Sequence, residues 1–218
     1  MGGGRVPDSF TEQTARIGDV TINYVRGGRR STLVLLHGYP QSWYMWRKVL
    51  PELAGQHTVI APDLRGSGGS DVPTGGYDKK TLAADVHGLL TQLGLDDDVS
   101  VVGHDIGAVV AYAYAAAHRD RVRKLVLTEA PIPDQSLYQL PTLTTRGPGL
   151  WNLGYFTVLT MPVLALGARA SLGDAVATQV ARYATTVTGD VVEDCGHWLF
   201  EEQPTELTTR LTRFLQRP

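Results

Sequence analysis

The sequence has little cysteine, no long apolar run and no excess of charge of one sign. Its single cysteine, Cys195, excludes an internal disulfide, and residues 1–10 lack the apolar core of a signal peptide. No apolar run approaches the roughly 18–20 residues of a membrane-spanning helix. The formal net charge is −2 and the basic residues are scattered, which argues against a nucleic-acid partner. We therefore expect a cytoplasmic protein with neither a membrane nor a nucleic acid as partner.

What is present is an alternation of strand-like and helix-like segments. With 43% hydrophobic residues, the 218-residue chain can bury one core and fits a single domain, 1–218. Apolar, β-branched runs predict strands at 20–25, 32–38, 58–64, 99–103, 122–130 and 161–168. Helical spacing predicts helices at 42–54, 81–94, 108–121, 175–184 and 204–215. This alternation predicts an α/β fold, a three-layer α/β/α sandwich around a mainly parallel sheet.

The most informative segment is GHDIG, residues 103–107, between a strand-like run and an alanine-rich helical run. Its two glycines allow a strained turn, a nucleophile elbow, that holds one side chain above the sheet edge. Most such turns carry serine, whose hydroxyl needs a base to remove its proton. Here the residue is Asp105, and a carboxyl with a reference pKa of about 3.9 is ionised at neutral pH. Asp105 is therefore a candidate nucleophile that can attack a saturated carbon directly.

A histidine and a second acid would complete the catalytic group. His197, in CGHW, follows a strand-like run and comes last in the chain order nucleophile, acid, histidine. The acid orients the histidine and stabilises its charged form. Glu129 ends the strand after the elbow, and sites in parallel sheets form at the carboxyl ends of strands. Asp174 is the alternative, but we expect it to cap the helix that begins at Ala175.

A second loop, HGYP at 37–40, is expected to supply an oxyanion hole. It follows the strand predicted at 32–38, so it can bring the backbone N–H of Tyr39 towards the elbow. The N–H of Ile106 would be the second donor. The alternative is that this loop forms only a tight turn.

Four further residues are expected near this site. Asp63 ends another predicted strand and should brace loops rather than perform chemistry. His37 and His104 flank the site and are expected to hold loops through hydrogen bonds. Trp43 either lines the pocket or, at helical spacing with Trp46, belongs to the core; the sequence leaves both open.

Six motifs follow one another along nearly the whole chain: HGYPQSWYMWR, APDLRGSGGSDVP, GHDIGAVVAYAYAAAH, LVLTEAPIPD, MPVLALG and EDCGHWLFEEQP. In this order they resemble the α/β-hydrolase family, specifically its branch of epoxide hydrolases and haloalkane or haloacetate dehalogenases. In that branch the acid can occupy the position of Glu129, as expected above. Dehalogenases usually place Trp or Arg directly after the nucleophile, where this chain has Ile106. The resemblance therefore implies an epoxide hydrolase, without metal or cofactor.

The sequence departs from its relatives between Glu129 and the strand at 161–168. Relatives insert a helical lid there, whereas we expect only a shortened loop, 131–160, in its place. Lid tyrosines of relatives protonate the leaving alkoxide; Tyr138 and Tyr155 are the candidates for this role here. Trp151 matches a lid tryptophan that is often followed by His, but here the next residue is Asn152.

Three functional hypotheses follow. The first is an epoxide hydrolase that acts on a small apolar substrate and water through an ester of Asp105, hydrolysed with the help of His197 and Glu129. The second is a dehalogenase that uses the same aspartate, or an esterase with an exposed site. The third is a catalytically silent scaffold that self-associates through the apolar face left open by the missing lid.

Overall fold

The computed structural model describes residues 5–130 and 158–216, which form an α/β sandwich. Eight strands make one sheet in the order β1-β2-β4-β3-β5-β6-β7-β8. β2 is antiparallel to both of its neighbours, and all other neighbouring strands are parallel. The strands are β1 (Phe10–Ile17), β2 (Val20–Gly27), β3 (Thr32–Leu36), β4 (Thr58–Pro62), β5 (Val99–His104), β6 (Val122–Thr128), β7 (Val163–Ala168) and β8 (Val187–Val192). The predicted fold class, with a mainly parallel sheet, is confirmed.

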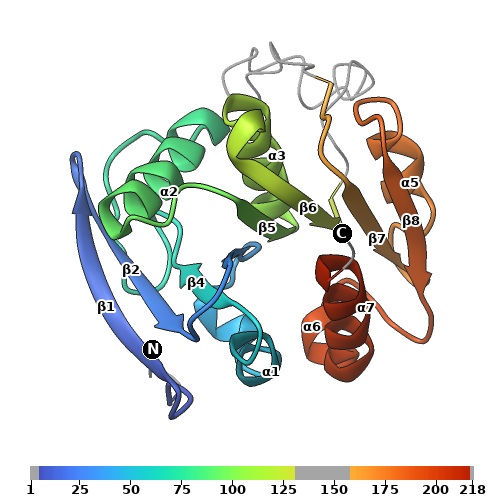
Figure 1. Ribbon diagram of the computed structural model, residues 1–218, viewed down its shortest axis with the longest axis horizontal. Helices are drawn as coiled ribbons and strands as arrows, with labels where there is room; N and C mark the ends of the chain where they lie inside the picture. The colour runs from blue at the N-terminus through green and yellow to red at the C-terminus, as the bar shows by residue number, and fades with distance from the viewer. Residues whose placement is uncertain (1–4, 131–157, 217–218) are drawn as a thin grey trace.

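Helices cover both faces of this sheet (Figure 1). One face carries α2 (Lys79–Leu93), α3 (Ile106–Ala117) and α5 (Ala175–Val180), and their apolar sides form one core cluster with the sheet. The other face carries η1 (Trp43–Trp46), α1 (Leu50–Ala54), α6 (Leu199–Glu202) and α7 (Pro204–Gln216), which form a second cluster. A short 3-10 turn, η2 (Arg119–Arg121), leads into β6. No helix in the described ranges is long and apolar enough to cross a bilayer.

The two clusters explain the sequence patterns. β3 and β4 read as continuous apolar runs and are buried along their whole length, because helices cover both faces of the central parallel strands. α7 buries one face only, through residues at helical spacing: Leu207, Leu211, Phe214 and Leu215. α2 is followed by Gly94, which caps the helix in the left-handed conformation expected of a C-terminal glycine.

Several elements differ from the prediction. The helix expected at 42–54 is broken into η1 and α1, and Pro51 stands in the first turn of α1. Proline lacks an N–H and favours a helix start, so a continuous helix cannot run through it. The helix expected at 175–184 ends at Val180. The edge strand β1 and the short α6 were not predicted, since β1 is mostly exposed and α6 is only one turn long.

Parallel strands place several loops at one edge of the sheet. The carboxyl ends of β3, β5, β6 and β8 lead into the segments that carry Tyr39, Asp105, Glu129 and His197. Segments far apart in sequence therefore meet at this edge.

Candidate active site

Asp105 occupies a strained turn between β5 and α3. Its backbone has φ 51° and ψ −125°, a region that residues other than glycine rarely adopt. The turn is close-packed: a Cβ added at Gly103 would lie 2.4 Å from the carbonyl oxygen of Gly107, and one at Gly107 would lie 2.2 Å from that of Leu36. Only glycine fits at positions 103 and 107, because neighbouring backbone atoms lie too close for a Cβ. The turn therefore has the geometry expected of the elbow.

The loop after β3 reaches the Asp105 carboxylate. The backbone N–H of Tyr39 donates to Asp105 Oδ2 at 2.9 Å. A Cβ at Gly38 would lie 2.8 Å from the Cβ of Asp105, so only glycine permits this approach. Ile106 begins α3, where a backbone N–H has no acceptor within its own helix. The structure thus brings the predicted donor Tyr39 to the predicted nucleophile, with Ile106 beside it.

Glu129 and His197 form a pair across the sheet edge. His197 Nδ1 lies 3.1 Å from Glu129 Oε2, and the other oxygen, Oε1, accepts the N–H of Ala168 at 2.6 Å. The Glu129 side chain is fully buried, whereas that of His197 is one-third exposed. A carboxylate at Nδ1 favours a proton there, which leaves the Nε2 lone pair free to accept a proton.

The alternative acid, Asp174, lies elsewhere. Its side chain is 81% exposed and faces Arg169 at 3.7 Å. It stands at the N-cap position of α5 but makes no capping hydrogen bond, because its backbone is helical rather than extended. The capping bond expected of Asp174 is therefore not formed, and Glu129 is the acid that contacts His197.

Two buried histidines support the loops around Asp105. The N–H of Leu64 donates to His37 Nε2 at 2.9 Å, so Nδ1 carries the proton and donates to the carbonyl oxygen of Gly38 at 2.8 Å. His104 Nδ1 lies 3.2 Å from the hydroxyl of Thr128. Burial lowers the pKa of His37. Burial, together with the repulsion that a protonated His104 would meet from the protonated forms of His197 and His37, lowers the pKa of His104 to about 3. Both rings are neutral at pH 7, which suits the predicted loop-holding role.

Asp63 joins three segments. Its carboxylate accepts the backbone N–H groups of Trp43 at 2.7 Å and Gly69 at 2.8 Å, and the side-chain amide of Asn23 at 2.9 Å. These contacts fit the expectation that Asp63 braces loops. The Trp43 side chain is 4% exposed and packs in the same core cluster as Trp46. Of the two interpretations of Trp43, the structure favours the core residue.

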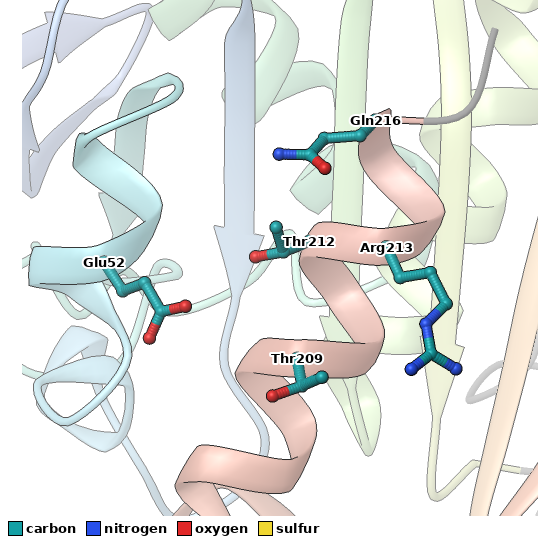
Figure 2. A pocket seen from close by; sticks show the side chains of 5 residues that line it. All are labelled: Glu52, Thr209, Thr212, Arg213 and Gln216. Atoms are coloured by element: carbon teal, nitrogen blue, oxygen red, sulfur yellow. The ribbon is translucent and has the colours of Figure 1, made fainter.

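Four predicted residues, Tyr138, Trp151, Asn152 and Tyr155, lie outside the described residues, as does most of the loop predicted at 131–160. Elsewhere, an open groove of about 510 Å³ lies between α1 and α7 (Figure 2). It contains none of the predicted site residues; its lining is Glu52, Thr209, Thr212, Arg213 and Gln216. Within the described ranges, no group of three or more His, Cys, Asp or Glu side chains could hold a metal ion.

Lys79, which begins α2, was not among the predicted site residues, although its charge interacts with that of Asp105. This helix packs beside α3, the helix that begins directly after Asp105 (Figure 1). Burial lowers the pKa of Lys79, and the negative charges of Asp105 and Asp78 act against this effect. The available signal was its position, because a helix that follows a parallel strand starts near the strand ends.

Comparison with known proteins identifies the class of protein. Residues 31–153, more than half of the chain, match the family model for the alpha/beta hydrolase fold. The chain belongs to the α/β-hydrolase family, as its motifs predicted, and it is a hydrolase of the epoxide hydrolase-like type.

The similar proteins are named for two different reactions, epoxide hydrolysis and dehalogenation. The chain is 35% identical to the soluble epoxide hydrolase of Corynebacterium sp. (strain C12) over 89% of this chain and 93% of that protein. The solved structure of epoxide hydrolase CorEH without ligand superposes with a TM-score of 0.82 at 31% identity, covering 94% of this chain and 98% of that one. A fluoroacetate dehalogenase of Burkholderia sp. is 38% identical over 61% of this chain but only 44% of its own length.

The chain is shorter than its epoxide hydrolase relative. The alignment spans 269 positions, but 89% of 218 residues is about 194, so about 75 aligned positions have no residue in this chain. A gap of this size agrees with the loss of a lid, while the position of the gap at 131–160 stays a prediction.

Proposed function

We propose that this protein hydrolyses epoxides to diols in two steps through a covalent ester of Asp105. The observation that carries the proposal is the carboxylate on the elbow, one oxygen of which accepts the Tyr39 N–H at 2.9 Å. An elbow carboxylate is a nucleophile for saturated carbon without prior loss of a proton. The names of the relatives support an epoxide as the substrate.

In the first step, Asp105 Oδ1 attacks a ring carbon of the epoxide. A carbon–oxygen bond of the ring breaks, and the electron pair stays on the leaving oxygen as an alkoxide that takes a proton. Tyr138 and Tyr155 are our candidates for the proton donor, and Trp151 and Asn152 are our candidates for contact with the substrate. Proton donation by a positioned group typically contributes about 10²–10⁴-fold in rate.

In the second step, His197 Nε2 takes a proton from water, and the water oxygen attacks Cγ of the Asp105 ester. The negative charge moves to Oδ2, where the N–H groups of Tyr39 and Ile106 stabilise it. Glu129 stabilises the positive charge that forms on His197. The intermediate then breaks the Cγ–Oδ1 bond of the ester, and the diol leaves with the proton from His197. The carboxylic acid that remains on Asp105 releases the second proton of the water, which replaces the proton that the donor gave to the alkoxide, so the carboxylate and the donor are both restored.

Mass spectrometry tests this sequence. With His197→Gln and a styrene-oxide-type substrate, we expect an adduct of substrate mass on the peptide that contains Asp105, because alkylation proceeds and hydrolysis does not. In ¹⁸O-labelled water, a single turnover of the unchanged enzyme should place the label in Asp105 rather than in the diol. Absence of an adduct across a broad panel of epoxides would overturn the proposal, and Asp105→Asn is the control that should form none.

Dehalogenation is the second candidate, favoured by the similarity to the fluoroacetate dehalogenase of Burkholderia sp.. The same attack by Asp105 on a carbon–halogen bond would release a halide instead of an alkoxide. Halide release from haloalkanes or haloacetates, absent in Asp105→Asn, would support this reaction. Ester cleavage that survives Asp105→Asn would instead identify an esterase activity that does not use this nucleophile.

A further inference from the structure

Gln41 shares the space beside the Asp105 carboxylate. The turn from Gly38 to Gln41 closes with a hydrogen bond from the Gln41 N–H to the Gly38 carbonyl oxygen at 3.0 Å, and the Gln41 side-chain oxygen lies beside Gly38. The position that a Cβ would take at Gly38 lies 3.1 Å from Asp105 Oδ2 and 3.1 Å from Gln41 Oε1. The absence of a side chain at Gly38 thus leaves a small space that the Gln41 carboxamide and the Asp105 carboxylate both line.

The oxygen of this carboxamide has no donor. Gln41 Oε1 is buried, and among the described residues it has no hydrogen-bond partner. An unpaired buried acceptor is unfavourable, and more so beside a carboxylate of the same polarity. The two ends of a carboxamide have nearly the same shape, so a half-turn about the last side-chain bond places Nε2 where Oε1 lies. In that orientation an N–H of the carboxamide lies beside Gly38, on the space that Asp105 Oδ2 also lines, where the carboxylate oxygen can accept it.

We propose that the Gln41 carboxamide donates to Asp105 Oδ2 as a third oxyanion donor, beside the N–H groups of Tyr39 and Ile106. Oδ2 already accepts the Tyr39 N–H, so it is the oxygen on which negative charge collects when water attacks Cγ. A further N–H aimed at this atom stabilises the tetrahedral intermediate. This role rests on the proposed ester mechanism, and it makes Gln41 a catalytic residue of the second step.

Substitutions that keep the shape of the side chain test the role. Gln41→Met removes the donor, and Gln41→Glu replaces it with an acceptor. We expect both variants to form the Asp105 ester at a rate close to that of the unchanged enzyme but to hydrolyse it about 10²-fold more slowly, the lower end for loss of one oxyanion donor. The ester should therefore accumulate in single-turnover experiments followed by mass spectrometry.

A matched control is Gln179→Met, because Gln179 Oε1 is also buried and unpaired in the described structure but lies on α5, against β7 and β8. It should hydrolyse the ester at the unchanged rate. The proposal would be overturned if Gln41→Glu hydrolysed the ester as fast as the unchanged enzyme. That result would show that a hydrogen-bond acceptor is sufficient at this position, for example one that accepts a proton of the attacking water.

A second readout does not depend on turnover. In ¹⁵N-labelled protein, the side-chain amide signal that disappears in Gln41→Met is assigned to Gln41. One of its two protons should be shifted downfield by the carboxylate, and this shift should be lost in Asp105→Ala. If no epoxide is opened but the downfield shift is present, the proposed function fails while the hydrogen bond from Gln41 to Asp105 stands. If the Gln41 amide signal has the same chemical shift in Asp105→Ala as in the unchanged protein, the Gln41 proposal itself is overturned.

Discussion

His197 Nδ1 lies 3.1 Å from Glu129 Oε2, although the two residues are 68 positions apart in the chain. Glu129 is fixed from its other side, since its second oxygen accepts the Ala168 N–H at 2.6 Å. A carboxylate held in this way sets the orientation of the imidazole and the position of its proton. Asp174, the other candidate for the acid that orients His197, is exposed and paired with Arg169. Substitution of each carboxylate in turn can therefore test which of the two acts on His197.

We predict that Glu129→Gln slows ester hydrolysis by about 10²–10⁴-fold, because the amide no longer stabilises the charged imidazole. Alkylation of Asp105 should change little, so the covalent ester should build up before the diol appears. Rapid-quench measurement of both species checks this. Asp174→Asn is the matched control and should leave both rates unchanged; equal losses in the two variants would contradict the assignment.

We predict that Gly107→Ala destabilises the fold by roughly 1–3 kcal/mol or more, because the new methyl group would lie 2.2 Å from the Leu36 carbonyl oxygen. Urea unfolding followed by circular dichroism measures the loss. Gly75→Ala is the control, since a Cβ at Gly75 meets nothing within 4 Å and its φ is not positive. A Gly107→Ala protein as stable as Gly75→Ala would mean that β3 and the elbow do not approach so closely.

We predict that the protein loses stability in mild acid. The folded-state pKa of His104 is about 3, below the value of about 6.5 in an unfolded chain, so the unfolded state binds more protons between these values. The contribution of His104 is therefore complete above pH 6.5 and is lost as the pH falls towards 3. His37 acts in the same direction.

Urea unfolding at pH 7 and pH 5 checks this dependence. In His104→Gln the difference in unfolding free energy between the two pH values should be smaller than in the unchanged protein, because one titrating group is gone. An unchanged difference would show that His104 does not titrate as its burial implies.

We predict that Asp63→Asn costs about 1.5–3 kcal/mol of stability. Asp63 accepts three N–H groups from Trp43, Gly69 and Asn23, whereas an amide at this position would turn one of its own donors towards a donor. Thermal unfolding measures the change. Asp190→Asn is a surface control, because the Asp190 side chain is 54% exposed in its pair with Arg210, and exposed pairs contribute little.

Much of the fold could be predicted because its signals are local. The central strands read as apolar runs, and Gly94 marked the end of α2. The edge strand β1 was missed because an exposed strand has no apolar face to give it a pattern. The helix expected at 42–54 was wrong as one element because the helical spacing of Trp43 and Trp46 outweighed Pro51 in the prediction.

The sequence by itself determined the class of protein and its candidate chemistry, because GHDIG and CGHW each encode a local turn with one reactive side chain, and HGYP encodes a turn with one backbone donor. Only the tertiary structure decided which groups meet. It paired His197 with Glu129 rather than Asp174, placed Trp43 in the core, and brought Lys79 and Gln41 near Asp105. The physical reason is that parallel strands bring the ends of distant segments to one edge of the sheet. Which side chains face each other at that edge cannot be inferred from their spacing along the chain.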